Sequence, residues 1–599
     1  MTISPKFKHH PLDLRCASLQ AWTLEGSAFG SGPIENLGLE AGFPLGMPVI
    51  SSHGKPSNTS GVARSDAFVV TAQYLDLLIS GGDHEFTTCI KLLVDGKVVA
   101  NDTGRRSAAA HPTTLDLSAW IGRLVQVEIV DKSNVAEPNR DWSWIRIGGM
   151  RMVSTPAVPI CRQPLYREAL RPRVHFTARQ WTMCRNEPGH RQEGWLNDLN
   201  GLVWFDGEYH LFAQRWNKCW IHAVSTNLVH WTELEPAFFE EGLETGVQSG
   251  SCVVDYNNSS GLGDGKTPPM VAFWSRNDNR SQCMSYSLDH GRTWTHWKDN
   301  PLMVIPERDP MVFRDHRRKR WTMVLYGESR YHFLISDNLL HWEVTGQIIN
   351  DSFECPDFFE LRINGVKETK WVLVRGNGHY SIGTFDGLGF KEETGQLQPD
   401  VGNNFYATQS WAAGTGIAPR RIQVAWVQGS RFPQMPFNQQ VSIPCDLTLR
   451  RTAQGLRLFR TPIPELVSLE TREHIWVDHK MKDGEVWGIG TRYSAFRLRA
   501  TFKAEITTEL ELRLSGSTIV IAGSKFHGSV GSGTVSVPIS EVDIIVDIAS
   551  IELFVNGGEL SATTSNFAGQ PDVVLTAHSG NVLIEHIRIT ELKSIWTGE

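Results

Sequence analysis

The feature that most constrains the fold is a repeat in the middle of the chain. Five times, a small or acidic residue opens an apolar strand, a polar turn follows, and a second apolar strand carrying aromatic residues comes next. The openings lie 53, 58, 48 and 52 residues apart, at Asp198, Ser251, Asp309, Asp357 and Gln409. A period of about 50 residues with four strands per unit is typical of a β-propeller. The repeat therefore predicts five blades within residues 174–460.

The sequence on either side of the repeat also predicts strands almost throughout, as short apolar or alternating runs between Gly, Asn and Asp turns. A Pro-bearing stretch predicts a linker over 156–173, and a second boundary is expected between 460 and 470. We therefore expect an all-β protein with three parts, at residues 1–155, 174–460 and 470–599.

Charge and cysteine content exclude several classes of protein. The net charge of −7 gives no global basic field, so we expect neither nucleic acid nor a membrane as partner. The one basic cluster, Arg314 to Arg320, is interpreted as a solvated turn between two strands. Nine scattered cysteines without a CxxC pair argue against a disulfide framework and a structural zinc site. The amino terminus lacks an apolar signal segment, so the protein as written is expected to be cytoplasmic, or secreted if a leader was removed.

Three carboxylates are expected to meet in the propeller. The first strand of each blade lines the central channel, so residues at the strand openings converge at one axial end. This places Asp198, Asp309 and Glu354 around one pocket, although they are 111 and 45 residues apart. Glycoside hydrolysis needs an acid to protonate the leaving oxygen and a second carboxylate to attack or to activate water. The three acids therefore favour a glycosidase.

At these residues the sequence resembles glycoside hydrolase family 32, the β-fructofuranosidases that include invertases, inulinases and levanases. WLNDLNG at 195–201 is similar to the family's nucleophile motif, which implies that Asp198 is the nucleophile and that Trp195 and Asn197 bind sugar. ERDP at 307–310 matches the RDP motif, implying that Asp309, with Arg308 beside it, binds fructosyl hydroxyls and stabilises the transition state. FECPD at 353–357 matches the EC motif, implying that Glu354 is the acid/base and that Cys355 lies in the sugar site.

Further segments extend the resemblance over roughly residues 175–595. They imply four more substrate-binding residues: Gln214 in FAQRW, Trp220 in KCWIHAVSTNLVHW, Ser249 in QSGSCVVD and Trp426 in IQVAWVQ. VDIASIELFVNGG at 546–558 resembles the β-sandwich that follows the propeller in this family. One departure, Leu199 in place of the usual Pro, is expected to reshape the leaving-group side of the pocket or to be compensated elsewhere.

Residues 1–155 lie outside the common two-domain pattern of the family. Their strands resemble, more loosely, the carbohydrate-binding or galactose-binding-like β-sandwich modules found ahead of some members. Trp142 and Trp144 are candidates for a sugar-stacking platform, although packing is the commoner role of two tryptophans near a strand.

The resemblance implies a retaining hydrolase that cleaves β-fructosyl linkages of sucrose, fructooligosaccharides, inulin or levan and releases fructose. Its substrate is a fructose-containing oligo- or polysaccharide, and no metal or other cofactor is expected. Three alternatives stay open: a fructosyltransferase, including one that forms difructose dianhydride, an inverting arabinosidase or xylosidase, and a non-catalytic fructan-binding protein. The sequence does not rank these substrates, or exo against endo attack, and leaves the oligomeric state undefined.

Overall fold

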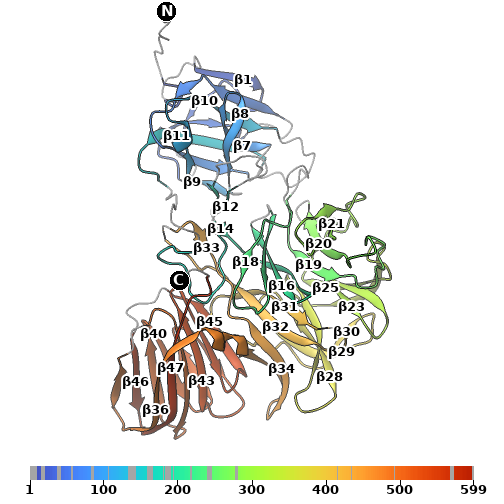
Figure 1. Cartoon of the computed structure of the whole chain (residues 1–599), viewed down its shortest axis with the longest axis vertical. Helices are drawn as coiled ribbons and strands as arrows, with labels where there is room; N and C mark the ends of the chain where they lie inside the picture. The colour runs from blue at the N-terminus through green and yellow to red at the C-terminus, as the bar shows by residue number, and fades with distance from the viewer. Residues whose placement is uncertain are drawn as a thin grey trace, which may run out of the picture. The chain divides into compact units, whose positions relative to one another are not determined.

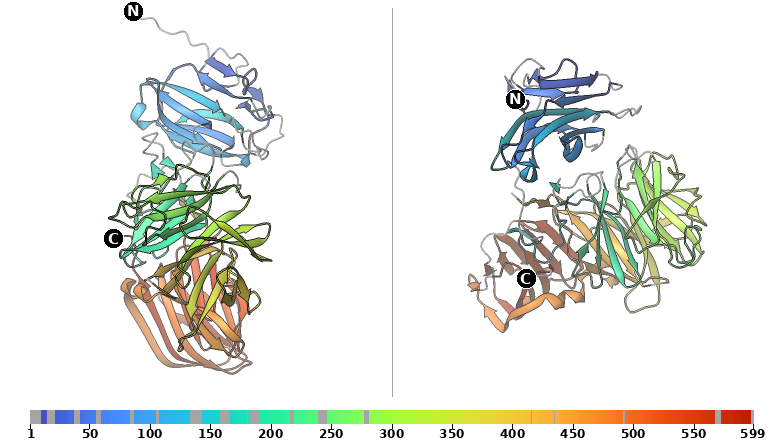
Figure 2. Two further views of the ribbon diagram at one scale, coloured as in Figure 1. Left: turned by 90° about the vertical axis from the view of Figure 1, so that its right-hand side faces the viewer. Right: turned by 45° about the horizontal axis from the view of Figure 1, so that its top comes forward.

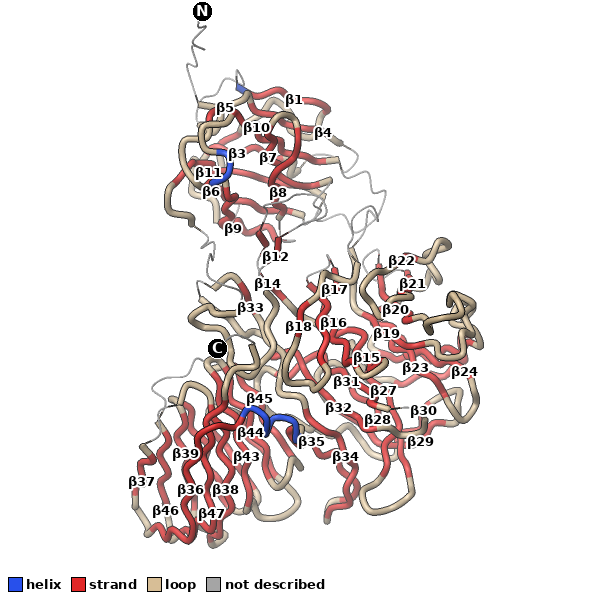
Figure 3. The backbone as a smooth tube through the Cα atoms, viewed as in Figure 1, coloured by secondary structure: helices blue, strands red, loops and turns tan. Residues whose placement is uncertain are grey.

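The computed structural model describes residues 10–14, 21–36, 42–54, 59–82, 87–104, 107–132, 143–157, 166–179, 181–182, 191–192, 194–215, 219–238, 246–276, 281–414, 416–433, 435–490, 493–566 and 572–596. Strands dominate, and the helices of the described residues are two short 3-10 turns, η2 (Ser118–Trp120) and η3 (Pro464–Leu469) (Figure 3). The expected all-β class is therefore confirmed. No helix in the described ranges is long and apolar enough to cross a membrane.

The chain divides into two compact units. Unit 1 comprises residues 1–165, 179–194 and 434–436, and unit 2 comprises 166–178, 195–433 and 437–599. Residues 166–173 of the predicted linker belong to unit 2, whereas residues 179–194 and 434–436 group with unit 1. Most of the second predicted part and all of the third lie together in unit 2.

Unit 1 contains two antiparallel sheets, coloured blue in Figure 1, with strand orders β1-β4-β10-β7-β8 (β5 also pairs with β10) and β2-β3-β11-β6-β9. Alternating apolar side chains of both sheets form one core that includes Leu77, Ile90, Val127 and Ile147. A separate pair joins β12 (Trp181–Thr182) to β13 (Arg191–Gln192). The strands of the two sheets are β1 (Trp22–Gly26), β2 (Ile34–Glu35), β3 (Pro48–Ser51), β4 (Gly61–Ser65), β5 (Phe68–Val69), β6 (Tyr74–Gly81), β7 (Thr88–Val94), β8 (Lys97–Thr103), β9 (Ser107–Asp116), β10 (Leu124–Asp131) and β11 (Ile145–Val153).

The repeat folds into five four-stranded antiparallel sheets, the blades of a propeller, shown from green to orange in Figures 1 and 2. Each predicted opening falls at or next to the start of a blade's first strand, except Gln409, which lies inside it. The blades are β15 (Leu199–Phe205), β16 (Glu208–Arg215), β17 (Cys219–Ser225) and β18 (Thr232–Glu233); β19 (Gly250–Val254), β20 (Met270–Arg276), β21 (Ser281–Ser287) and β22 (Thr295–His296); β23 (Arg308–Asp315), β24 (Arg320–Gly327), β25 (Arg330–Ser336) and β26 (Glu343–Ile349); β27 (Asp357–Arg362), β28 (Thr369–Val374), β29 (Tyr380–Phe385) and β30 (Phe390–Glu392); β31 (Phe405–Ala413), β32 (Arg420–Val427), β34 (Cys445–Thr452) and β35 (Gly455–Pro462). The short strands β14 (Gly194–Trp195) and β33 (Phe437–Asn438) complete this region.

Each described blade is built from one continuous stretch of sequence, so the first and last blades do not exchange a strand. Contacts between side chains close the ring at this point. Trp411 of β31 is fully buried at this seam and donates its indole N–H to the carbonyl of His210 in β16 at 2.8 Å. Trp231, which directly precedes β18 of the first blade, stacks 5.8 Å from Trp411. Apolar packing, with few polar contacts, therefore holds the seam.

A second pair of sheets follows the propeller, coloured red in Figure 1, with strand orders β36-β47-β38-β43-β44-β45 and β37-β46-β39-β40-β41-β42. Leu498, Leu512, Ile544 and Leu575 belong to the core that the two sheets enclose. The strands are β36 (Glu470–Met481), β37 (Val486–Ile489), β38 (Phe496–Ala504), β39 (Glu509–Leu514), β40 (Ser517–Ala522), β41 (Lys525–Gly528), β42 (Gly531–Thr534), β43 (Glu541–Asp547), β44 (Ser550–Val555), β45 (Leu560–Ser565), β46 (Val573–His578) and β47 (Val582–Leu592).

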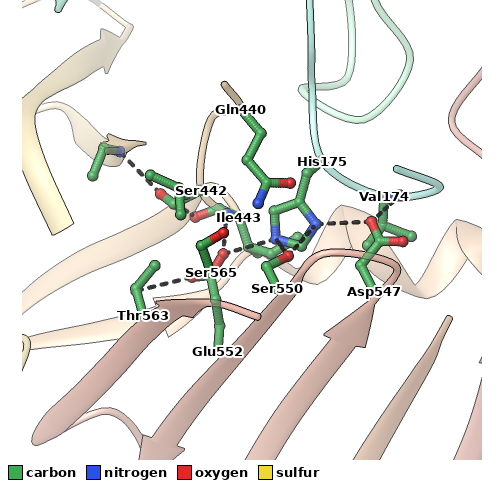
Figure 4. Close-up of polar contacts among 12 residues, drawn as sticks. Val174, His175, Gln440, Ser442, Ile443, Asp547, Ser550, Glu552, Thr563 and Ser565 are labelled. Atoms are coloured by element: carbon green, nitrogen blue, oxygen red, sulfur yellow. Dashed lines mark hydrogen bonds and ion pairs between the residues drawn. The ribbon is translucent and has the colours of Figure 1, made fainter. Parts of the chain in front are cut away.

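A buried imidazole ties the segment before the propeller to this sandwich (Figure 4). His175 lies 2.9 Å from Asp547 through Nδ1 and 2.9 Å from Glu552 through Nε2, and all three side chains are fully buried. Glu552 also accepts the backbone N–H of Ile443, at the edge of the last blade, at 2.7 Å. Burial lowers the pKa of His175, but the hydrogen bonds to the two carboxylates outweigh it and raise that pKa to about 9. His175 is therefore an imidazolium that joins three segments of unit 2.

Candidate active site

The three predicted acids converge on one thiol at the end of the propeller channel. Cys355 Sγ lies 3.8 Å from Asp198 Oδ2 and 3.7 Å from Asp309 Oδ2, and Glu354 precedes Cys355 in the chain. Asp198 comes from the first blade, Asp309 from the third, and Glu354 from the turn that enters the fourth. The structure thus brings together the carboxylates that the repeat predicted to meet.

Hydrogen bonds fix each of the two deeper acids. Asp198 Oδ2 accepts the Ser249 hydroxyl at 2.9 Å, and the same hydroxyl lies 2.7 Å from Gln214 Oε1. Asp309 Oδ2 accepts the backbone N–H of Cys355 at 2.9 Å. Ser249, Gln214 and Cys355 are all buried, so they act on the site by orienting the acids.

The Glu354 side chain is 30 % exposed, against 8 % for that of Asp309. Arg308 Nη2 donates to its Oε1 at 2.5 Å, and the Tyr406 hydroxyl donates to its Oε2. The Arg308 guanidinium also lies over the Tyr326 ring, 4.6 Å from its centroid. Two donors from different blades therefore hold the Glu354 carboxyl group.

Residues with positive φ lie beside the acids and orient the side chains of the site. Register shifts interrupt β15 between Asn200 and Val203, β23 between Arg308 and Met311, and β31 between Tyr406 and Gln409. Each bulge contains one residue with positive φ, namely Gly201 (54°), Asp309 (57°) and Ala407 (46°). The first strands of blades one, three and five therefore each contain a bulge with one positive-φ residue. Such a bulge changes the face of the sheet to which the following side chains point.

The turn before β27 is strained in the same sense, with φ of 35° at Glu354 and 33° at Cys355. The buried Tyr331 hydroxyl lies 3.0 Å from the carbonyl of Phe353 and 2.7 Å from that of Glu354. The backbone N–H of Gly376 donates to the same two carbonyls at 2.7 and 3.0 Å. These bonds hold an unfavourable backbone geometry that presents Glu354 to the pocket.

Burial and mutual repulsion disfavour ionisation of the deeper acids. Burial raises the pKa of Asp309 to about 7, against the Cys355 N–H bond and with a further contribution from the Asp198 charge. Burial also raises the pKa of Asp198, while the Ser249 bond opposes the shift and the Glu354 charge adds to it. Shifted carboxylates in a pocket are typical of a catalytic site.

The other predicted sugar-binding residues divide into two groups. Trp195 donates its indole N–H to Asn197 Oδ1 at 3.1 Å, which places both residues beside Asp198. Trp426 pairs with Tyr406 in the sheet, and their rings are 6.0 Å apart. These two tryptophans are partly exposed and form aromatic walls.

The expectation that Trp220 binds sugar directly needs correction. Its side chain is fully buried in a core cluster, its ring lies 4.9 Å from that of Phe238, and its indole N–H donates to the carbonyl of Gln248 at 3.0 Å. A residue without exposed surface cannot contact a ligand, so Trp220 supports the segment that carries Ser249. The structure also shows Leu199 fully buried in the core, so its side chain does not reshape the leaving-group side.

Sequence reasoning missed Tyr406 and Tyr331 as parts of the site. Tyr406 lies three residues before the predicted fifth opening at Gln409, so a residue type able to donate to a carboxylate was visible there. Of the candidates in unit 1, Trp144 is buried with its ring 4.3 Å from that of His53, and Trp142 lies outside the described residues. Among the described residues no group of three His, Cys, Asp or Glu side chains is arranged to hold a metal ion.

Comparisons with known proteins agree with this geometry. Residues 190–462 match the sequence model of the glycosyl hydrolases family 32 N-terminal domain. The chain is 30% identical over 498 residues to a levanase of Bacillus subtilis (strain 168), covering 72% of each protein. It is 27% identical to the extracellular exo-inulinase inuE of Aspergillus niger, covering 68% of this chain and 94% of the relative. A β-fructofuranosidase of Schwanniomyces occidentalis, solved with fructosyl-erythritol, shares the fold with a TM-score of 0.62 at 24% identity, covering 73% of this chain and all of that one.

Proposed function

This chain belongs to glycosyl hydrolase family 32, and we propose that it hydrolyses β-fructosyl linkages of sucrose or fructans with retention of configuration, releasing fructose. The relatives named levanase and exo-inulinase support this substrate class. The observation that carries the proposal is the meeting of Asp198, Asp309 and Glu354, from three blades, around Cys355.

In the proposed mechanism Asp198 attacks the anomeric carbon of the fructosyl unit while Glu354 protonates the departing oxygen. Asp198 suits the first role because Ser249 orients its carboxylate. Glu354 suits the second because its side chain is partly exposed and two donors hold its carboxyl group in place. Water activated by Glu354 then cleaves the fructosyl-enzyme ester, and both acids return to their starting protonation states.

Asp309 is proposed to bind hydroxyl groups of the fructosyl ring. Its carboxylate is held by the Cys355 N–H and lies 3.8 Å from Arg308 Nε, so its position is fixed before substrate arrives. A fixed charge that faces a developing oxocarbenium ion stabilises the transition state without reorganisation. Trp195 and Trp426 would supply apolar faces for the sugar rings.

The test is a product profile of the full-length protein on sucrose, kestose, inulin and levan, together with two variants. Asp198→Ala should abolish release of fructose from every substrate. Glu354→Gln should lower kcat by about 10²–10⁴ on sucrose, and by less on an aryl β-fructoside, whose leaving group needs little protonation. Near-normal turnover by either variant, or an equal loss on both kinds of substrate for Glu354→Gln, would refute these roles.

A further inference from the structure

A cavity of about 470 Å³ lies in the propeller channel beyond the three acids, and none of them lines it. Its walls come from the first strands of all five blades, continued by the turn after β23 and by residues 414 and 416–419. Arg314, at its far end, is five residues beyond Asp309 in the same strand, which is about 16 Å at the usual rise of a β-strand. The cavity therefore extends from the strand openings at Ser251, Asp357 and Gln409 to the far end of the channel, and the acids lie outside it.

Hydrogen bonds between neighbouring inner strands separate the two ends. The Ser251 hydroxyl donates to the carbonyl of Pro310 at 2.7 Å, Gln409 Nε2 donates to that of Gly250 at 3.1 Å, and the Ser410 hydroxyl donates to Asp357 Oδ2 at 2.6 Å. Ser251 and Gln409 stand at strand openings and Ser410 follows Gln409, so this layer of bonds lies next to the acids. None of the three acids lines the cavity, so the acids and the cavity are separate sites.

Two arginines of the cavity lining each carry a hydrogen-bond donor atom that has no partner among the described residues. Arg421 of β32 lies over the Phe359 ring, 4.7 Å from its centroid, and its buried Nε has no hydrogen-bond partner among the described residues. The charge beside it is Asp357, which already accepts the Ser410 hydroxyl and whose pKa burial raises to about 6. Asp357 therefore compensates Arg421 only in part.

Arg314 adds a second unused donor, because its buried Nη1 also lacks a partner in the described part of the chain. The other carboxylates in the lining are already paired. Asp315 binds Arg318 at 3.1 Å, and Glu360 binds Arg317 at 2.5 Å. The donor atoms without a partner on these two arginines thus belong to charged groups, and charged donors favour an anion.

The basic cluster of the sequence forms the rim of this cavity. Arg314, His316 and Arg317 line it from the turn between β23 and β24. A cluster of positive groups at the mouth of a cleft raises the local concentration of anions. Inside, aromatic side chains from four blades offer planar apolar surface: Trp204, Tyr256, Phe313 and Trp371.

We propose that this cavity is a second binding site, distinct from the fructosyl site, for a small organic anion with a carboxylate on a planar apolar body. The carboxylate would accept from Arg421, and the body would pack on the aromatic walls. The cavity volume lies within the range of about 300–1,000 Å³ that is usual for small-molecule sites.

The test compares benzoate with benzyl alcohol, two probes of similar size that differ in the carboxylate. Binding is measured on the full-length protein by calorimetry and by saturation-transfer NMR in chloride-free buffer. Benzoate should bind at least about tenfold more tightly than benzyl alcohol. Arg421→Gln should weaken benzoate binding at least about tenfold and Arg421→Lys less, because lysine keeps the charge. Ala412→Phe, which fills the cavity next to Arg421, should abolish binding while keeping both arginines.

Arg451→Gln is the matched control, because Arg451 is an exposed arginine of the same propeller outside the cavity, and it should leave benzoate binding unchanged. Saturating sucrose, added to the Glu354→Gln variant, should not displace benzoate. Equal binding of the two probes, unchanged binding in both Arg421→Gln and Ala412→Phe, or displacement by sucrose would each overturn the proposal. None of these results depends on turnover, so they are independent of the proposed hydrolase activity.

Discussion

Asp309→Asn should make the protein more stable at alkaline pH while it removes most of the activity. Burial and two neighbouring carboxylates raise the pKa of Asp309 from 3.8 to about 7. This shift corresponds to about 4 kcal/mol against the ionised form, at 1.36 kcal/mol per pKa unit. The folded protein therefore holds a proton at Asp309 that the unfolded chain has released, between pH 3.8 and about 7.

The sign of the effect on stability follows from this proton. As pH rises from 3.8 to about 7, the Asp309 carboxyl group lowers the free energy of unfolding of the wild-type protein by up to about 4 kcal/mol. Above pH 7 the free energy of unfolding stays lower by that amount. Asparagine does not titrate, and its carbonyl oxygen still accepts the Cys355 N–H. Because the substitution also removes the attraction to Arg308, we expect a gain of about 1–4 kcal/mol at pH 8 and little gain at pH 4.

Calorimetric melting of both proteins at pH 4, 6 and 8 measures this difference, and kcat on sucrose should fall about a hundredfold. Asp315→Asn is the matched control. Asp315 is equally buried in the same strand but is paired with Arg318, so its loss should destabilise the protein at pH 8. A Tm of Asp309→Asn at or below that of wild type at pH 8, or a difference that does not vary with pH, would refute the reasoning.

Three further predictions concern positioning, stability and stereochemistry. Tyr331→Phe should lower kcat about tenfold with little change in KM, because the strained Glu354 turn loses two hydrogen bonds while the sugar contacts remain; an effect on KM alone in initial-rate kinetics would contradict it. His175→Gln should lower Tm more at pH 6 than at pH 9.5, since a His pKa raised to about 9 contributes about 3 kcal/mol below pH 6.5 that is lost as pH passes 9; the exposed His341→Gln serves as control, and a pH-independent loss would be the contrary result. Added methanol should capture the fructosyl unit as the β-fructoside, and an α-configured first product in NMR would make Asp198 a general base.

The sequence predicted the blades and the acids because both depend on spacing. Strand openings recur at a nearly constant interval, and the ends of inner strands must meet at the channel, so Asp198 and Asp309 could be placed together without coordinates. The family motifs added the individual roles, which the variants above are designed to test.

Side-chain direction within a strand was less predictable. A shift of one residue reverses which face a side chain occupies, and bulges introduce such shifts in three inner strands. Trp220, which lies on β17, and Leu199, which precedes the bulge in β15, are near the pocket according to the motifs but are buried in the core. The cavity beyond the acids could not be predicted from the sequence either, because Arg314 and Arg421 are 107 residues apart and no motif connects them.

The seam between the first and last blades has a consequence for how the protein can be cut and rebuilt. Trp596, near the carboxyl end, donates to the carbonyl of Pro172 at 2.8 Å, and its ring stacks on Tyr166 at 4.2 Å. Both segments pack into the core cluster that contains Trp411. Residues that precede and follow the propeller in sequence thus pack against the joint between its first and last blades, the one joint between neighbouring described blades that the chain does not cross. A crossover just before Tyr166 would keep both segments, whereas a crossover after His175 would remove the contacts that Trp596 makes with Tyr166 and Pro172.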